Sequence, residues 1–441
     1  MRVFLIGAGQ VGTTIVEALH EDHEITVLDT EGSRLQALTS RFDVAVFEGN
    51  GTSRKDLSAA GIGRADLVIA CTSRDEVNIV AGMFSRREAE KATTVIRTSS
   101  SEYVELWREG QLDVDFVVSS ELETAYAISR ILGVPAARQT DVFADGQVQV
   151  GEFDVDENAS ADVVGVPLRN ASLPSDSKVA AIIRGDGMIL PRGDEELLHG
   201  DRVVIIGSPA AAKAWSALLW PEGGTVRDVV IYGAGRVGSA IARVLREQGL
   251  SVRMVEAERE QARRVAEAFP DVRVFNASGF DPDFLERERI GQAQAGIFAM
   301  RDDAKNQYAA SLASVHGIPF TIAIAHEAVS ISAFEQAGID VSVNPRAVTA
   351  EEIVRFAHDP RMQQVAMLEG NRYEVLDVTT RETSRYIGMS FRDMPVHGSL
   401  IGAIVRNGQA IFPHGDDVLE AGDRVIIFTE AANAPWVVEA L

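Results

Sequence analysis

A glycine-rich turn occurs twice in this chain, and the two copies are 226 positions apart (233 − 7). The first copy is Gly7-Ala8-Gly9-Gln10-Val11-Gly12, and the second is Gly233-Ala234-Gly235-Arg236-Val237-Gly238. An acid follows each turn after about twenty residues, Asp29 in the first copy and Glu256 in the second, and that spacing is typical of a dinucleotide-binding unit. The chain is therefore predicted to be a tandem duplication of such a unit.

Short apolar segments alternate with helical segments along each copy. Strands are expected in the first copy at residues 2–6, 24–28, 44–47, 66–70, 94–96 and 114–118. The succession restarts in the second copy, with strands at 228–232, 253–255, 272–275 and 296–299. Strands that alternate with helices predict two Rossmann-like α/β domains, each a doubly wound parallel sheet.

The segment after each α/β copy has a different texture, with short β-branched runs broken by turns. It also repeats, because Arg184 and Asp201 recur as Arg406 and Asp423, each displaced by 222 (406 − 184). We expect a linker near residues 220–224, where proline and paired glycines interrupt regular structure. The expected domains are two nucleotide-binding units and two small α+β units, at residues 1–138, 139–222, 226–360 and 361–441.

Composition narrows the partners that this chain can have. The 441 residues carry a formal net charge of −23, which disfavours binding to nucleic acid or to an anionic membrane surface. Cys71 is the only cysteine, so a disulfide framework is excluded and a reducing cytoplasm is the expected compartment. We find neither a signal sequence nor an apolar stretch long enough for a membrane helix, and expect no direct membrane insertion.

Polar residues follow several expected strands of the first copy, at the sheet edge where α/β proteins bind ligands. They belong to Gly49-Asn50-Gly51-Thr52, to Thr72 through Asn78, and to Arg97 at the end of the next strand. Because an acid accepts hydrogen bonds from ribose hydroxyls and repels a 2′-phosphate, NAD is expected rather than NADP. The predicted cofactor-binding residues are Gly7, Ala8, Gly9, Gln10, Val11, Gly12, Asp29, Asn50, Gly51, Thr52, Thr72, Ser73, Asp75, Asn78, Arg97, Gly233, Ala234, Gly235, Arg236, Val237, Gly238, Glu256 and Ser278.

Residue patterns for catalysis are missing from the sequence. The eight histidines show no metal-ligand spacing, and Ser330 stands where a zincin motif beginning at His326 would need its second histidine. Neither a phosphate-binding lysine turn nor a nucleophile elbow is present. We therefore predict a binding protein with no catalytic residues and no metal site, and not an enzyme.

These motifs together resemble the bacterial TrkA family of potassium-uptake regulatory proteins, which carry tandem regulator-of-potassium-conductance (RCK) domains. The resemblance covers essentially the whole chain, from the first glycine turn to the Gly-Asp pairs of the small domains. It implies a cytoplasmic subunit that binds NAD(H) and ATP or ADP and forms a homo-oligomer, a tetrameric ring. It further implies peripheral attachment to the inner membrane face, through a potassium-translocating membrane subunit whose opening the ring controls.

The second copy departs from the pattern of the first. Met300 stands in place of Thr72, Ala304 in place of Glu76, and Ala325 is expected in place of Arg97. Asn50 and its equivalent Ser278 occupy a position where many members of the family have an acid. Arg236 replaces Gln10, and a guanidinium in that turn could reach a triphosphate. We therefore hypothesise that the first site prefers NAD(H) and the second prefers ATP or ADP.

Two other functions are compatible with a duplicated glycine turn. An NAD-dependent oxidoreductase with two dinucleotide-binding domains would need a hydride-acceptor site and an acid or base, and ATP binding would argue against it. A redox-responsive transcription regulator would need a DNA-reading segment, which the acidic balance and the absence of a helix-turn-helix pattern make remote.

Overall fold

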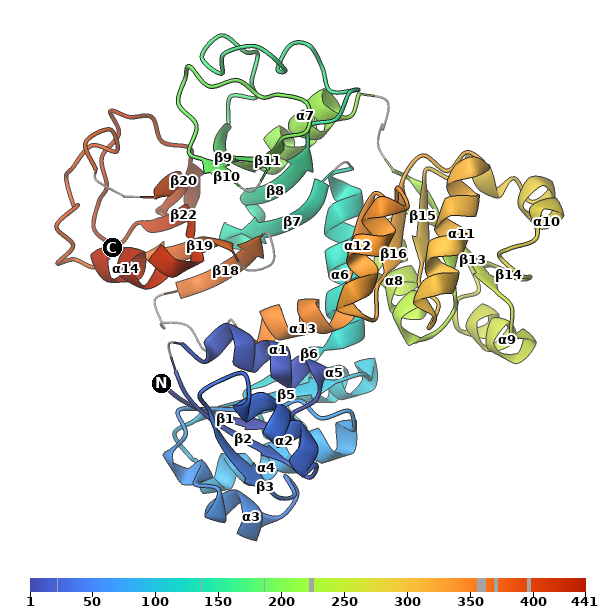
Figure 1. The fold of residues 1–441 in the computed structure, drawn as a ribbon, viewed down its shortest axis with the longest axis vertical. Helices are drawn as coiled ribbons and strands as arrows, with labels where there is room; N and C mark the ends of the chain where they lie inside the picture. The colour runs from blue at the N-terminus through green and yellow to red at the C-terminus, as the bar shows by residue number, and fades with distance from the viewer. Residues whose placement is uncertain are drawn as a thin grey trace. The chain divides into compact units, whose positions relative to one another are not determined.

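The computed structural model describes residues 1–441 except 22, 136, 186, 222–225, 355–361, 369–371 and 395–397. The chain divides into two compact units, each built from two separate segments (Figure 1). Unit 1 comprises Met1–Tyr126 and Asp228–His358, and unit 2 comprises Ala127–Arg227 and Asp359–Leu441. The expected linker residues 222–224 lie outside the described residues.

The first half of unit 1 is a six-stranded parallel sheet in the order β3-β2-β1-β4-β5-β6, which is the order of a dinucleotide-binding fold. Its central strands are apolar and buried along their length, as a sheet with helices on both faces requires. The strands are β1 (Arg2–Ile6), β2 (Glu24–Asp29), β3 (Ala45–Glu48), β4 (Leu67–Ala70), β5 (Thr93–Thr98) and β6 (Phe116–Ser119). The helices are α1 (Gln10–Leu19), α2 (Gly32–Thr39), α3 (Arg54–Ala59), α4 (Asp75–Glu88), α5 (Ser101–Arg108) and α6 (Ser120–Gly133).

The second half of unit 1 repeats this topology with the order β14-β13-β12-β15-β16-β17, again all parallel. The strands are β12 (Asp228–Tyr232), β13 (Ser251–Glu256), β14 (Arg273–Asn276), β15 (Ala295–Phe298), β16 (Thr321–Ile324) and β17 (Val341–Val343). The helices are α8 (Arg236–Glu247), α9 (Arg259–Ala268), α10 (Pro282–Arg287), α11 (Asp303–Val315), α12 (Ala328–Gln336) and α13 (Pro345–Val354). The predicted pair of Rossmann-like folds is confirmed.

Unit 2 contains two antiparallel five-stranded sheets, with the orders β10-β9-β11-β8-β7 and β18-β19-β22-β20-β21. The first has strands β7 (Ala137–Phe143), β8 (Val148–Asp154), β9 (Ser177–Arg184), β10 (Gly187–Ile189) and β11 (Arg202–Gly207), with helix α7 (Pro209–Leu219). The second has β18 (Met362–Leu368), β19 (Tyr373–Thr379), β20 (Ser399–Arg406), β21 (Gln409–Ile411) and β22 (Arg424–Glu430), with helix α14 (Ala434–Ala440).

The two small domains of unit 2 share one hydrophobic core. Buried residues of the first, such as Phe143 and Ile206, belong to the same cluster as Val375 and Phe428 of the second. The sheets also bond across this junction, because the Gln147 side chain donates to the carbonyl of Gly408 at 2.8 Å and accepts from the backbone of the same strand pair. The two small domains therefore pack as one body (Figure 1).

The residues that repeat between the small domains at an offset of 222 include an arginine and an aspartate, which form an ion pair in each domain. Arg184 donates through two nitrogens to the two oxygens of Asp201, each at 2.7 Å, and Asp201 is only 2% exposed. Arg406 and Asp423 form the same bidentate pair at 2.8 and 2.7 Å. Each aspartate also accepts a backbone N–H from the turn before it, so the pair fixes the entry to the last strand.

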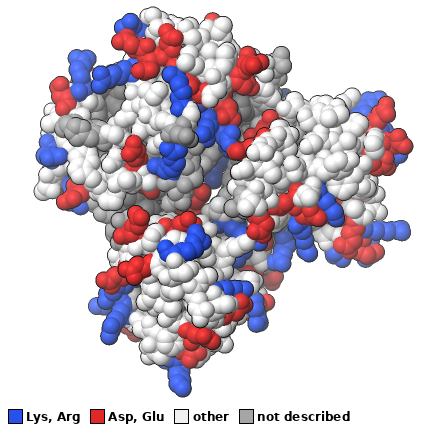
Figure 2. All heavy atoms as spheres, in the orientation of Figure 1, with Lys and Arg blue, Asp and Glu red and all other residues white. Residues whose placement is uncertain are grey.

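Acidic and basic side chains are interspersed on the face of the molecule drawn in Figure 2. None of the helices in the described part of the chain combines the length and the hydrophobicity that a membrane crossing requires.

Candidate functional site: pockets at the two glycine turns of unit 1

The first glycine turn joins β1 to α1 in a conformation that only glycine supports easily. Gly7 has φ of +111°, and a Cβ there would lie 3.0 Å from the backbone nitrogen of Thr72. A Cβ on Gly12 would overlap the carbonyl oxygen of Gly7, so α1 can pack this closely only with glycine at that position. The turn thus brings the N-terminus of α1 to the cleft, where its free N–H groups and positive end favour a phosphate.

Asp29 ends β2, and its side chain accepts a hydrogen bond from the glycine turn. Its Oδ2 accepts the N–H of Ala8 at 2.6 Å, its Oδ1 accepts the N–H of Glu31 at 2.8 Å, and the side chain is 8% exposed. Each carboxylate oxygen retains a lone pair, which a ribose hydroxyl can use. Asp29 therefore holds the turn in addition to its predicted role in binding the ribose.

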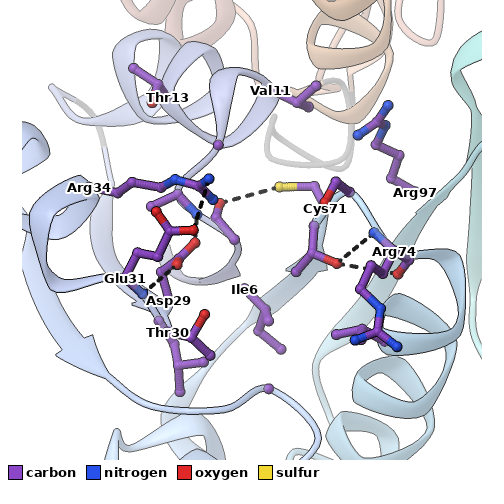
Figure 3. Close-up of a pocket in the computed structure, with 18 of the residues that line it drawn as sticks. Ile6, Val11, Thr13, Asp29, Thr30, Glu31, Arg34, Cys71, Arg74 and Arg97 are labelled. Carbon is purple, nitrogen blue, oxygen red and sulfur yellow. Dashed lines mark hydrogen bonds and ion pairs between the residues drawn. The ribbon is translucent and has the colours of Figure 1, made fainter.

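A pocket of about 1150 Å³ opens over this edge of the sheet (Figure 3). In the close-up, Asp29, Glu31 and Arg34 lie on one side of it, and Cys71 and Arg97 lie on the other. The predicted residues that line the pocket are Gly7, Ala8, Gly9, Gln10, Val11, Asp29, Asn50, Gly51, Thr52, Thr72, Ser73 and Arg97. The structure thus brings together residues from five strand ends, β1 to β5, as expected for a nucleotide cleft.

Three residues predicted for the first site lie outside the pocket lining and build its wall. Gly12 is packed against the turn, and Asp75 accepts the N–H of Ser99 at 3.0 Å. Asn78 is fully buried, and its carboxamide joins the backbone of Thr72 to the carbonyl of Arg97. Contact between these three residues and a cofactor stays a prediction.

Arginines that the sequence analysis did not assign to the site also line this pocket. Arg34 lies on α2, the helix after Asp29, and Arg41 follows that helix. A basic residue on the helix after the acidic strand end is a sequence feature that could have indicated this contact. Arg346 comes from α13 of the second half of unit 1, which packs against α1. No pattern in the sequence could have placed Arg346 here, because its position depends on how the two halves of unit 1 meet.

Cys71 directly follows β4 and is 3% exposed, with its Sγ 3.6 Å from the carbonyl oxygen of Gly7. Burial raises the pKa of the Cys71 thiol to about 12. Since the thiolate is the reactive form, we expect a disulfide reagent to modify native protein at pH 8 far more slowly than unfolded protein. Absorbance after mixing with such a reagent, with and without urea, measures this, and equal rates would contradict the buried position.

The second glycine turn has the same backbone geometry as the first. Gly233 has φ of +97°, and the N–H of Ala234 donates to Oε2 of Glu256 at 2.8 Å, as Ala8 donates to Asp29. Val237 and Gly238 continue into α8, and a Cβ on Gly238 would overlap the carbonyl oxygen of Gly233. Ser278 is exposed and accepts the N–H of Phe280 at 3.3 Å.

Two aromatic residues of the second half stand at the positions of pocket-lining residues of the first. Asn306 repeats the hydrogen bonds of Asn78 at an offset of 228 (306 − 78). The same offset places Phe280 at the position of Thr52 and Tyr308 at that of Val80, and their ring centroids are 5.5 Å apart. The second cleft thus differs from the first in shape as well as in polarity.

The structure corrects one equivalence by a single residue. Asn78 donates to the carbonyl of Arg97, whereas Asn306 donates to the carbonyl of Ile324, not of Ala325. The asparagine and this carbonyl are one residue closer in the sequence in the second half than in the first. Ile324, and not Ala325, is therefore the equivalent of Arg97. The expectation that the second copy lacks this arginine holds, and the residue that replaces it is a buried isoleucine.

A smaller pocket, of about 420 Å³, lies at the second turn. Gly235 and Arg236 line it from the second half, and Ser99 and Glu121 line it from the first. Arg236 donates to Oγ of Ser99 at 2.6 Å. Oε2 of Glu121 is buried and has no hydrogen-bond partner among the described residues, so this pocket contains an unsatisfied acid near an arginine.

Burial raises the pKa of Glu121 to about 7, against the opposing effect of Arg236 and Arg97. A carboxyl whose pKa is raised on folding costs stability as pH increases from its unfolded pKa to its folded one. We therefore expect Glu121→Gln to stabilise the protein at pH 8, by at most about 3 kcal/mol, and to have little effect at pH 4.5. Thermal melting of both proteins at the two pH values checks this, and an equal shift at both would contradict it.

The described residues contain no group of three or more histidine, cysteine or acidic side chains placed to hold a metal ion.

Residues 3–120 and 229–345 match the TrkA-N domain, and residues 150–219 and 375–435 match the TrkA-C domain. The chain belongs to the TrkA family. Its TrkA-family relatives include a Trk system potassium uptake protein TrkA homolog of Archaeoglobus fulgidus, 31% identical over 98% of this chain and 97% of the relative.

Another TrkA-family relative is the Trk system potassium uptake protein TrkA of Haemophilus influenzae, 28% identical over 99% of this chain and 98% of that protein. Among solved structures, the GsuK RCK domain matches with a TM-score of 0.60 at 17% identity, covering 100% of this chain and 95% of that chain. The GsuK channel bound to NAD matches with a TM-score of 0.60, covering 100% and 79%. At this identity the solved structures show the RCK fold for this TrkA-family chain.

Proposed function

We propose that this chain is the nucleotide-sensing regulatory subunit of a potassium-uptake system. The observation that carries the proposal is the first cleft, a dinucleotide-type pocket in a chain of the TrkA family. Residues 1–138 and 226–360 serve as the nucleotide-binding domains, and residues 139–222 and 361–441 serve as the small domains. The subunit binds ligands and catalyses no reaction.

The first site takes NAD(H). The pocket provides a glycine turn for the pyrophosphate and Asp29 for the ribose of the adenosine. One structure of the same fold is described as bound to NAD, which supports this choice. Asp29 disfavours a 2′-phosphate, so NADH binds more tightly than NADPH.

The second site takes ATP or ADP. Arg236 at the start of α8 adds a guanidinium to the phosphate-binding end of the turn. Phe280 and Tyr308 are larger than Thr52 and Val80, the residues at the equivalent positions of the first half. The second site therefore has less room, which suits a mononucleotide better than a dinucleotide. The two sites thus report on different nucleotides.

The partner is a potassium-translocating membrane subunit, and the chain acts at the inner face of the membrane as a homo-oligomeric, tetrameric ring. The names of the TrkA-family relatives refer to Trk potassium uptake, which supports this partner. A nucleotide that binds two ring conformations with different affinities shifts their populations, and the membrane subunit responds to that shift.

Rubidium uptake tests the proposal in cells that lack this chain, at low external potassium. Wild type should restore uptake, and Asp29→Asn should alter its nucleotide response at equal protein level. Asparagine is chosen because it keeps one of the two oxygens that accept from Ala8 and Glu31, whereas alanine would remove both. Uptake that is unchanged by the deletion would overturn the proposed function.

A further inference from the structure

Two charged residues of the second half of unit 1 contact the first cleft or a residue that lines it, and neither was predicted as a site residue. Arg346 at the start of α13 lines the 1150 Å³ pocket. Glu327 precedes α12, and its Oε2 accepts from Nε2 of Gln10, in the first glycine turn, at 3.0 Å. The other oxygen of Glu327 lies 3.4 Å from the Arg346 guanidinium, which also donates to the carbonyl of His326.

This arrangement places a carboxylate beside the residue that begins α1. The N-terminus of α1 is where the phosphates of a nucleotide bind, and a carboxylate there repels additional negative charge. NAD has a pyrophosphate with both ends esterified, whereas ATP has a polyphosphate chain with a free, more highly charged end. Glu327 therefore opposes ATP more strongly than NAD(H).

The pairing of Glu327 with Arg346 is weak enough to be exchanged. Their side chains are 57% and 35% exposed, and ion pairs this exposed contribute little to stability. Arg346 would form stronger charge-assisted bonds with a phosphate, since a guanidinium can bind two phosphate oxygens together. Arg346 is thus held by one exposed carboxylate and by the carbonyl of His326.

The second site lacks this arrangement. Ser100 occupies the position equivalent to Glu327, because the residues before them make the same backbone bonds to the aspartate that begins the neighbouring helix. At the second turn the arginine is Arg236 of the turn itself, where the first site has Gln10. The two sites therefore differ in their carboxylate: Glu327 at the first site is exposed, whereas the pocket at the second turn contains Glu121 with a buried carboxylate oxygen.

We propose that Glu327 and Arg346 set the nucleotide preference of the first site. Glu327 holds Arg346 and excludes a free polyphosphate end, so that NAD(H) is favoured. When Glu327 is released, Arg346 binds the terminal phosphates of ATP, and the contact between Gln10 and the second half of unit 1 is broken. The inference rests on the proposed function, because it assumes that the first cleft binds nucleotides.

Titration of the full-length protein with NADH, followed by displacement with ATP, tests this at the first site through NADH fluorescence. Glu327→Gln should raise the affinity for ATP by about tenfold, because a charge-charge repulsion is removed and a charge-assisted bond becomes available. Its affinity for NADH should change by less than twofold, and Glu327→Gln with Arg346→Gln should lose most of the gain in ATP affinity. Glu260→Gln, which removes one negative charge from the exposed face of α9 in the same half, is the matched control and should leave both affinities unchanged.

The possible failures can be told apart. Wild type that binds neither NADH nor ATP overturns the proposed function itself. If wild type binds NADH and Glu327→Gln leaves the ratio of the two affinities unchanged, this inference is wrong and the proposed function stands. A gain that persists in the double variant would also overturn it, since Arg346 would then play no part.

Discussion

Alanine at Gly9 is expected to lower the affinity of the first site for NADH by about 10- to 100-fold, the effect of forcing one methyl group into a closely packed contact. Gly9 precedes α1 and lines the pocket, and a Cβ built on it meets no protein atom within 4 Å. The methyl group would therefore project into space that the pyrophosphate must enter, while the fold stays intact. Isothermal titration with NADH, alongside thermal melting, measures both quantities.

Two other glycines provide the controls for Gly9→Ala. Gly235→Ala is the same change in the second turn, where a Cβ also meets no atom within 4 Å, and it should leave NADH binding unchanged. Gly12→Ala should destabilise the fold, because its Cβ overlaps the carbonyl of Gly7. Normal NADH affinity in Gly9→Ala would show that no phosphate approaches this turn closely.

Asp201→Ala is expected to destabilise unit 2 by about 3 kcal/mol, near the lower end of the cost of breaking a buried ion pair, because Arg184 is partly exposed. The change leaves a guanidinium without its bidentate partner and the N–H of Leu198 without its acceptor. Urea unfolding followed by a signal from unit 2, such as the fluorescence of buried Trp215, gives the loss in stability.

Asp423→Ala should lower the same unfolding transition by a similar amount, since Asp423 makes the equivalent bonds and both sheets border one core. Asp194→Ala is the control, because its pair with Arg169 is highly exposed and should contribute less than about 0.5 kcal/mol. Separate transitions for the Asp201 and Asp423 variants would contradict a shared core.

Much of the architecture could be predicted because it is encoded locally. Runs such as Val3 to Ile6 are apolar at every position, which a strand covered on both faces requires, and a glycine turn follows directly. The acid after the next strand, Asp29, then marks the part of the first cleft where a ribose is predicted to bind. These signals lie within thirty residues of one another, within reach of pattern analysis.

Contacts between distant segments could not be predicted in this way. Arg346 lines the first cleft because α13 packs on α1, more than three hundred positions away (345 − 10 = 335). Glu327 likewise contacts Gln10 from a distant segment. Gln139, likewise, donates to the carbonyl of Met367 at 2.7 Å across the two small domains. The substitution of Phe280 for Thr52 was visible in the sequence, but its effect on the cleft depends on the neighbouring Tyr308 ring.

Because the two small domains of unit 2 share one core within one chain, their association does not depend on the concentration of the protein. Phe143 and Phe428 belong to one apolar cluster, although an entire α/β domain separates their segments in the sequence. Because both segments are in one polypeptide, their association is intramolecular and does not weaken on dilution, unlike the pairing of two separate chains. A cell that makes few copies of this protein therefore still obtains every copy with its two small domains already joined.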